Sequence, residues 1–228
     1  MFQEKLESKK NEVYKRERYV DGEKLFVVEK EFLEEKHFYI EYILHDILSK
    51  NGLSVPRLLD FESPAGDFKG KLVYEFLEGD LALDALADKH TAEEMLVEVI
   101  IWMERFYEIT AENSSGEQWV LGDIHLRNFI YDKEKGILYG FDFEEAEKGV
   151  IERDIARLFL FIATYEPEYS ELHLELAEYF LKGALTEFKL SKQELLDEVY
   201  GEAKRMAERR KREVRTEMLT AIVERNFE

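Results

Sequence analysis

The sequence contains no cysteine among its 228 residues. Disulfide bonds, thiol nucleophiles and cysteine-ligated zinc or iron–sulfur centres are therefore excluded. The five histidines are scattered and form no HExxH pattern, so a metal site would be built mainly from oxygen ligands. Oxygen ligands suit magnesium, calcium or manganese.

Long apolar runs are also missing. No stretch approaches the roughly eighteen apolar residues of a membrane-spanning helix. The N-terminal segment is charged throughout and lacks the apolar core of a signal peptide. We therefore expect a cytoplasmic protein without a membrane partner.

Positive charge is scarce, because 32 Lys and Arg residues stand against 51 Asp and Glu residues, a net charge of −19. Such a field repels nucleic acid, so we expect no nucleic-acid partner except through a basic helix at 204–215. We interpret this basic run as a solvated helix face with intrahelical ion pairs. The alternative is a contact for tRNA, a phosphorylated substrate or an acidic partner.

The N-terminal third has the pattern of a small sheet with one helix. Residues 12–32 predict two strands joined by a turn at Asp21-Gly22. A helix that ends at Asn51-Gly52 follows, and two more strands are expected after Pro56. The apolar stripe that indicates this helix consists of Ile40, Ile43, Leu44, Ile47 and Leu48.

Beyond Gly79 the pattern becomes mainly helical. A capping box at residues 91–94 predicts a helix through about Thr110. A β-rich segment then precedes a helical region that begins at Ile151 and contains two further helices. The order of elements predicts an α+β fold, with a boundary near residues 77–80.

Two short motifs carry the chemistry, GDIHLRN at 122–128 and GFDFEE at 140–145. Asp123 and Asn128 bracket a loop, and Asp142 follows a strand among phenylalanines. A carboxylate among aromatic residues is costly unless it is exposed, paired or bound to metal. A hairpin that folds the two motifs together would form a magnesium site with a neighbouring base.

The two motifs resemble the kinase-like phosphotransferase superfamily. They look closest to the aminoglycoside phosphotransferase and choline kinase branch, whose catalytic loop reads hGDxHxxN and whose metal strand reads hhDFE. The spacing from Asp123 to Asn128 also agrees with the protein-kinase catalytic loop. The resemblance implies a protein-kinase-like two-lobed fold, with a nucleotide-binding N-lobe at 1–78 and a helical C-lobe at 79–228. It also implies ATP and Mg²⁺ as cofactors.

The same resemblance assigns roles to the acidic and amide residues of the two motifs. Asp123 would be the catalytic base, and Asn128 and Asp142 would be magnesium ligands. Glu144 stands where this branch often has a second acidic group, so it would assist with metal. Asp154 resembles the helix aspartate that anchors the catalytic loop through backbone N–H groups.

The N-lobe is expected to hold the nucleotide. Lys30 fits the phosphate-pairing lysine of the third strand, and Glu41 fits its glutamate partner on the helix. Val28 lies on the same strand face and would contact adenine. Backbone groups near Glu75 and Leu77 would hydrogen-bond the base.

Each N-lobe assignment has an alternative. Lys30 could be an ordinary edge-strand lysine, and Glu41 could lie on a solvated helix face. Glu34 and Glu35 compete for the role of the lysine's partner.

Several residues depart from the family pattern. No GxGxxG precedes Lys30, and Ser8 and Asn11 match a glycine-poor loop only loosely. Leu121 replaces the histidine that usually precedes Gly-Asp. Arg127 contacts either phosphate or solvent, and His125 is expected to orient the loop.

The expected reaction is transfer of the ATP γ-phosphate to a hydroxyl group. The short segment between Glu144 and Asp154 leaves no room for an activation loop, which favours a small-molecule acceptor such as a sugar, an aminoglycoside or a choline-like compound. The alternatives are a small atypical Ser/Thr protein kinase with a protein substrate, and a nucleotide-binding pseudokinase that acts as a scaffold.

Overall fold

The structure is a computed structural model that describes residues 2–8, 10–20 and 22–227. The chain divides into two compact units. Unit 1 comprises Met1–Asp80 and Ile130–Ala146, and unit 2 comprises Leu81–Phe129 and Glu147–Glu228. This division differs from the expected lobes at 1–78 and 79–228, because the segment that carries Asp142 belongs to unit 1.

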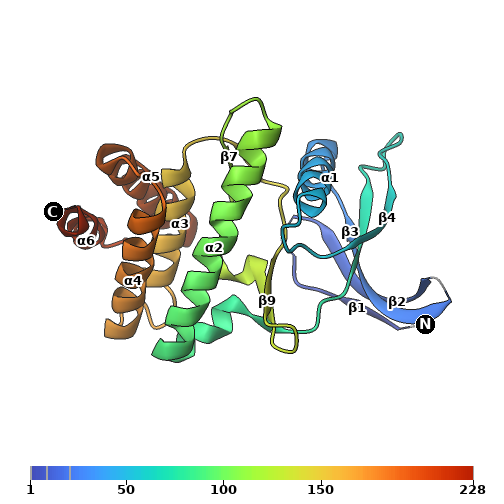
Figure 1. The fold of residues 1–228 in the computed structure, drawn as a ribbon, viewed down its shortest axis with the longest axis horizontal. Helices are drawn as coiled ribbons and strands as arrows, with labels where there is room; N and C mark the ends of the chain where they lie inside the picture. The colour runs from blue at the N-terminus through green and yellow to red at the C-terminus, as the bar shows by residue number, and fades with distance from the viewer. Residues whose placement is uncertain (1, 9, 21, 228) are drawn as a thin grey trace. The chain divides into compact units, whose positions relative to one another are not determined.

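Unit 1 is built on a five-stranded antiparallel sheet of order β1-β2-β3-β5-β4 (Figure 1). Its strands are β1 (Gln3–Lys5), β2 (Glu12–Val20), β3 (Glu23–Glu31), β4 (Leu58–Glu62) and β5 (Lys71–Glu75). The predicted hairpin is present, with Val20 of β2 opposite Glu23 of β3. Asp21 of the predicted turn lies outside the described residues. Strand β3 is central, which places its side chains in the middle of the unit.

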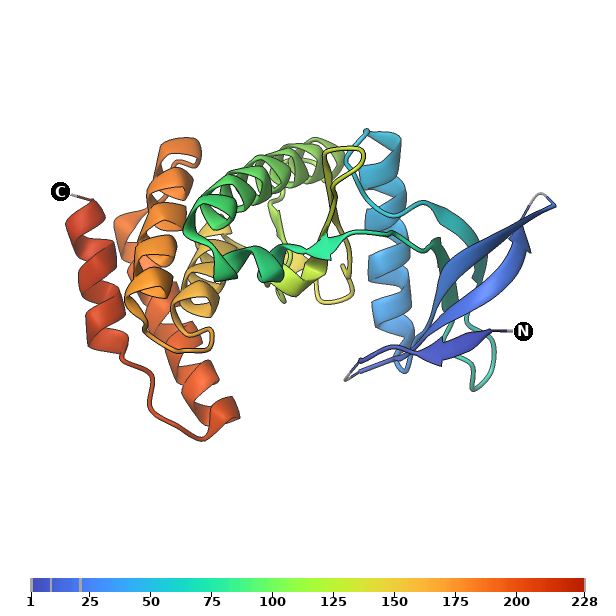
Figure 2. The same ribbon diagram turned by 90° about the horizontal axis from the view of Figure 1, so that it is seen from below.

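Helix α1 (Glu35–Lys50) lies beside this sheet (Figure 2). It ends where the sequence predicted, since Gly52 adopts a φ of +77° directly after the capping Asn51. The predicted apolar stripe is only partly right, because Ile43 is 53% exposed. The buried face instead consists of Phe38, Glu41, Leu44, His45 and Leu48.

Two polar residues can lie on the buried face of α1 because each has a hydrogen-bond partner. His45 Nε2 donates to Pro56 O at 2.6 Å, and Glu41 accepts from Tyr74 and Lys30. Phe38 anchors the same face in a cluster with Phe32, Leu72 and Tyr74.

A second small sheet completes unit 1. Strands β8 (Phe129–Asp132) and β9 (Ile137–Gly140) form a hairpin, and β6 (Asp80–Leu81) pairs with β8. Gly140 N–H donates to Ser54 O at 3.1 Å. The chain then enters the segment of the second motif, residues 141–146.

Unit 2 is mostly helical. Its short elements are η1 (Ala82–Ala87), β7 (Trp119–Val120), η2 (Leu126–Asn128) and β10 (Glu147–Lys148). Its α-helices are α2 (Lys89–Asn113), α3 (Ile151–Ala163), α4 (Glu171–Glu187), α5 (Lys192–Arg210) and α6 (Thr216–Asn226). Within the described residues, three helices therefore follow α3, where we predicted two.

Helix α2 begins earlier than predicted. Asp88 is the N-terminal cap and accepts a hydrogen bond from Thr91 N at 2.9 Å. Thr91 thus lies inside the helix, and the predicted capping box at 91–94 is wrong. The aspartate side chain satisfies an N–H group that would otherwise lack a partner.

Helix α3 forms the core of unit 2, where it packs against α4, α5 and β7. Its residues Ile155, Leu158, Phe159 and Ile162 are fully buried. An antiparallel sheet with one helix in unit 1, and a mostly helical unit 2, confirm the predicted α+β class.

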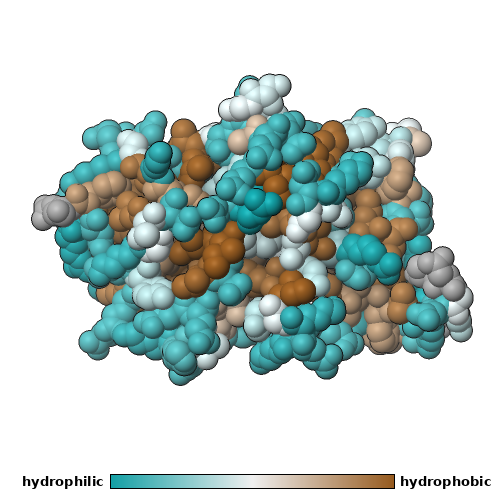
Figure 3. Space-filling model, viewed as in Figure 1, coloured by the Kyte–Doolittle hydropathy of each residue, from teal (hydrophilic) through white to brown (hydrophobic). Residues whose placement is uncertain are grey.

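The surface agrees with the acidic composition. Hydrophilic residues predominate on the face seen in Figure 3, and apolar residues occur between them in small groups. Among the described helices, none is both long enough and apolar enough to cross a membrane.

Candidate active site

Lys30 is the centre of a buried ion-pair cluster in unit 1. Its Nζ lies 2.6 Å from Glu41 Oε2 and 2.6 Å from Asp142 Oδ1. Glu144 Oε2 lies 2.9 Å from the same nitrogen. Glu41 and Glu144 are buried, whereas the side chain of Asp142 is 40% exposed. Solvent therefore reaches the cluster at Asp142, while the other two carboxylates are buried.

The sheet and helix α1 position the first pair. Lys30 lies opposite Val13 of β2 and Leu72 of β5, so it is not an edge-strand lysine. Glu41 reaches it from α1 and also accepts a hydrogen bond from the Tyr74 hydroxyl at 2.9 Å. The Lys30–Glu41 pair is thus present, and the competing Glu34 and Glu35 are exposed.

Electrostatic crowding shifts the pKa values in this cluster. Burial raises the pKa of Glu41 to about 7, and the carboxylates of Asp142 and Glu144 add to the rise while Lys30 opposes it. Burial alone would lower the pKa of Lys30, but its three carboxylate neighbours raise it above the ordinary value. The ammonium therefore stays charged, and three carboxylates compete for one cation.

This crowding suits a divalent cation. Glu41, Asp142 and Glu144 each offer a carboxylate oxygen, and the three atoms lie within 4.8 Å of one another. Oxygen donors of this kind are the ligands that Mg²⁺ prefers. Asp142 also has a φ of +70°, a left-handed conformation that non-glycine residues seldom adopt outside functional or turn positions.

The glycine-poor segment before β2 contacts the second motif. Asn11 is buried, and its side-chain amide donates to Glu144 Oε2 while its Oδ1 accepts from Leu33 N at 3.2 Å. Lys10 Nζ lies 2.5 Å from Glu145 Oε1. Ser8 Oγ accepts from Asn11 N at 3.2 Å. Sequence reasoning matched Ser8 and Asn11 only loosely and missed these contacts with the acidic segment.

The expected adenine contacts also lie in unit 1. Val28 is half-buried and packs against a cluster that includes Tyr74 and Phe32. Glu75 ends β5, where its N–H donates to Arg57 O at 3.0 Å, and Leu77 is buried just beyond it. Binding of a nucleotide base by these residues stays a prediction.

The first motif forms a compact loop in unit 2. Asn128 is buried, and its Nδ2 donates to Asp123 O at 3.0 Å. Asp123 N donates to Leu121 O at 2.8 Å, and Gly122 adopts a φ of +71°. The side chain of Asp123 is 35% exposed. The loop therefore holds the backbone of Asp123 and leaves part of its carboxylate accessible.

Asp154 anchors this loop from α3, as predicted. Its carboxylate accepts from Leu121 N at 2.7 Å, from Gly122 N at 3.1 Å and from the Tyr107 hydroxyl at 3.0 Å. Burial raises the pKa of Asp154 to about 6, although these hydrogen bonds oppose the rise. Asp154 thus supports the loop from inside the core.

Sequence reasoning missed Arg157, which also contacts this loop. Its NH2 donates to Asp123 Oδ1 at 2.5 Å, and its NH1 donates to Gly122 O. A signal existed in the sequence, because Arg157 follows Asp154 by three positions and therefore shares its face of α3.

The structure brings the candidate residues together in two groups. Unit 1 joins Lys30, Glu41, Asp142 and Glu144, and unit 2 joins Asp123 and Asn128. The expectation that both groups face one nucleotide stays a prediction.

The basic run at 204–215 is not one helix. Helix α5 ends at Arg210, and Lys211 ends it in a left-handed conformation with a φ of +54°. Arg205 makes the expected intrahelical pair with Glu202 at 2.8 Å. Arg210 instead pairs with Glu168 at 2.8 Å, and Arg212 pairs with the same carboxylate, so the ion pairs are only partly intrahelical.

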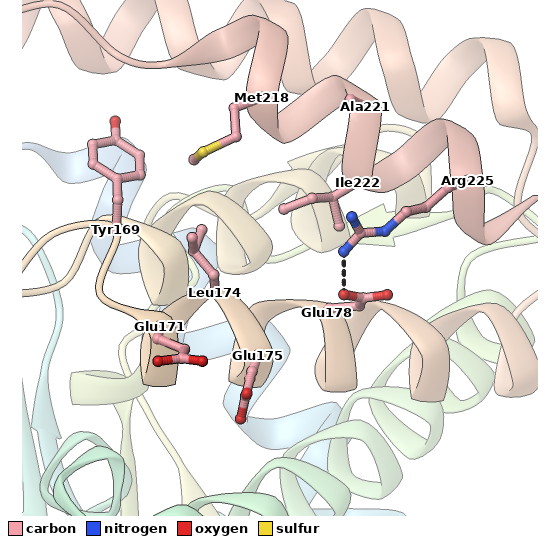
Figure 4. A pocket seen from close by; sticks show the side chains of 9 residues that line it. All are labelled: Tyr169, Glu171, Leu174, Glu175, Glu178, Met218, Ala221, Ile222 and Arg225. Atoms are coloured by element: carbon pink, nitrogen blue, oxygen red, sulfur yellow. Dashed lines mark hydrogen bonds and ion pairs between the residues drawn. The ribbon is translucent and has the colours of Figure 1, made fainter.

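Unit 2 also contains an open groove of about 530 Å³ between α4 and α6 (Figure 4). The Glu178–Arg225 ion pair crosses it. Its lining residues are Tyr169, Glu171, Leu174, Glu175, Glu178, Met218, Ala221, Ile222 and Arg225. None of the predicted site residues lines this groove, so the groove is not part of the candidate active site.

No protein-family model matches the sequence. No curated protein matches it either. Among solved structures, the chain is similar to the kinase PK-1 of the Cydia pomonella granulovirus, with a TM-score of 0.47 and 21% sequence identity. The similarity covers 64% of this chain and 52% of that chain, so about half of the viral kinase is spanned.

Proposed function

We propose that this chain is an ATP- and Mg²⁺-dependent phosphotransferase that moves the γ-phosphate of ATP to a hydroxyl group. The observation that carries the proposal is the buried Lys30–Glu41 pair with the Asp142 carboxylate on the same ammonium. Kinases use such a strand lysine and helix glutamate to hold phosphates, beside an aspartate that binds metal.

The residues fit a magnesium ion and a polyphosphate. Glu41, Asp142 and Glu144 supply clustered oxygen donors, and the pKa of Glu41 is raised to about 7 in this crowd. Asp142 and Glu144, with Asn128, would hold Mg²⁺, which would neutralise charge on the phosphates. Lys30 would add a second positive charge against the same phosphates.

Asp123 is the proposed base. In the proposed step its carboxylate takes the proton of the acceptor hydroxyl, whose oxygen forms the new bond to the γ-phosphorus. The bond from this phosphorus to the bridging oxygen breaks, and its electron pair leaves with ADP. Asn128 holds the backbone carbonyl of Asp123, which orients the loop for this role.

We propose a small molecule as the acceptor. Nine residues separate Glu144 from Asp154, and β10 and the start of α3 occupy most of them. A regulatory activation loop has no room there, which favours a small-molecule acceptor over a protein substrate. A screen of sugars, aminoglycosides, choline and protein substrates distinguishes these acceptors.

A thermal-shift measurement tests nucleotide binding. ATP should stabilise the protein strongly only when Mg²⁺ is present, because binding to the folded state raises the unfolding temperature. Asp142→Asn should reduce this Mg²⁺-dependent shift, and Asp123→Asn should keep it. A shift that is absent, or that is unchanged in Asp142→Asn, would contradict the proposal.

Turnover then distinguishes a kinase from a pseudokinase. ADP formation from MgATP should be measurable for the wild type and should be lost in Asp123→Asn. Nucleotide binding without ADP formation in either protein would favour the scaffold alternative.

A further inference from the structure

Arg157 on α3 binds two groups of the proposed catalytic loop at once. Its NH1 donates to the carbonyl of Gly122, and its NH2 donates to Asp123 Oδ1 at 2.5 Å. The Arg157 side chain is only 18% exposed. A planar guanidinium presents its donors in a fixed geometry, so it fixes the carbonyl and the carboxylate relative to each other.

A second carboxylate lies near the Nε of this guanidinium. Glu202 of α5 is 2% exposed, and its Oε1 lies 3.9 Å from Arg157 Nε. This oxygen has no hydrogen-bond partner within the described part of the chain, while Oε2 accepts from Arg205 Nε at 2.8 Å. A buried carboxylate needs a nearby cation, so Glu202 helps to hold Arg157 in place.

The helix that carries Arg157 is itself firmly packed. The neighbouring Leu158 and Phe159 are fully buried, and Asp154 on the same face accepts the N–H groups of Leu121 and Gly122. One turn of α3 therefore binds the N–H groups, a carbonyl and the acidic side chain of the loop. This arrangement preorganises a reacting group on a rigid element.

We infer that Arg157 is a positioning residue that sets the direction of the Asp123 carboxylate, and that Glu202 supports it from α5. The inference rests on the proposed function of Asp123 as the base. It adds a functional role for α5. Misplacing a reacting group by about 1 Å can cost about 100-fold in rate.

The first test measures the rate of ADP formation from MgATP. The phosphate goes to water or to the best hydroxyl compound found in the acceptor screen. Arg157→Gln should lower kcat by about 100-fold and leave the KM for ATP within about twofold. Arg157→Lys should retain part of the rate, since one ammonium can reach the carboxylate but cannot bind both groups. Glu202→Gln should lower kcat by about tenfold.

Arg153 provides a matched control on the same helix. It pairs with Glu147 and Glu198 and makes no contact with Asp123 among the described residues. Arg153→Gln should therefore leave kcat unchanged. An equal loss of kcat in Arg153→Gln and Arg157→Gln would overturn the inference.

A double variant separates positioning from stability. Arg157→Gln leaves the buried Glu202 without one of its cations, and Arg157→Gln with Glu202→Gln removes this uncompensated charge. The double variant should recover thermal stability and still turn over about 100-fold more slowly than the wild type. Recovery of kcat together with stability would show a merely structural role.

The Asp123→Asn variant separates this inference from the proposed function on which it rests. Turnover that survives in Asp123→Asn would refute the proposed base, whereas loss in Asp123→Asn with full activity in Arg157→Gln would refute the positioning role alone.

Discussion

Replacing Lys30 by methionine should strongly destabilise the protein in a pH-dependent way. Lys30 lies 2.6–2.9 Å from three carboxylates, of which Glu41 and Glu144 are buried. Removing one partner of a buried ion pair costs about 3–5 kcal/mol. Asp142 is partly exposed and adds little to this cost. We therefore expect Lys30→Met to lower the free energy of unfolding by about 4 kcal/mol at pH 8.

The pH dependence follows from Glu41. Its pKa in the folded protein is already raised to about 7 from 4.5, and loss of Lys30 raises it further. Between the unfolded and folded pKa values the folded state binds more protons, so stability is lost as the pH rises through this window. The cost of Lys30→Met should therefore be smaller at pH 5.5 than at pH 8.

Urea unfolding followed by circular dichroism measures both values. Lys50→Met is the matched control, because Lys50 pairs with Asp46 at 2.7 Å on the surface and should contribute about 0–1 kcal/mol. Mg²⁺ without nucleotide should stabilise Lys30→Met more than the wild type, since it replaces the missing cation. A cost below about 1 kcal/mol that is equal at both pH values would refute the reasoning.

Three further results are expected. Burial raises the pKa of Asp154 to about 6 from 3.8, so the folded state binds more protons and stability falls as the pH rises between these values. In urea unfolding, the wild type should lose about 2–3 kcal/mol over this range that Asp154→Asn does not lose. A wild-type stability that increases with pH would show that the hydrogen bonds to the carboxylate outweigh its burial. Gly70→Ala should lower the free energy of unfolding in urea by about 2–4 kcal/mol, because Gly70 has a φ of +104° and a Cβ there would lie 2.4 Å from the Phe38 ring. Gly66→Ala is the control: Gly66 has a φ of +58° but a Cβ there meets no atom within 4 Å, so the cost should be about 1–2 kcal/mol. A tRNA titration should show no binding through the run at 204–215, since glutamates pair several of its cations, and steep salt dependence would contradict this.

Local patterns predicted much of unit 1. The alternation of β3 placed Lys30 and Val28 on one face, and glycine after Asn51 marked the end of α1. The buried face of α1 was harder, because hydrophobic patterning treats Glu41 as a solvent-facing residue. Only tertiary partners, Lys30 and Tyr74, make its burial possible.

Contacts between distant segments account for most of what the sequence did not show. Arg157 lies 34 positions from Asp123, and Asn11 lies 133 positions from Glu144. No local pattern links Asn11 with Glu144, and Arg157 was marked only by its spacing of three positions from Asp154, because both contacts depend on how separate elements pack. The start of α2 was missed for a local reason, since Asp and Thr are both common capping residues and the cap is Asp88, whose side chain accepts from Thr91 N.

Unit 1 is made of two separate stretches of the chain, which has a consequence for its folding during synthesis on the ribosome. Residues 81–129 must be translated before Ile130–Ala146 can join the earlier strands. During that interval Lys30 can meet Glu41 but neither Asp142 nor Glu144. A nascent chain halted before residue 130 should therefore be more sensitive to protease within its first eighty residues than the finished protein.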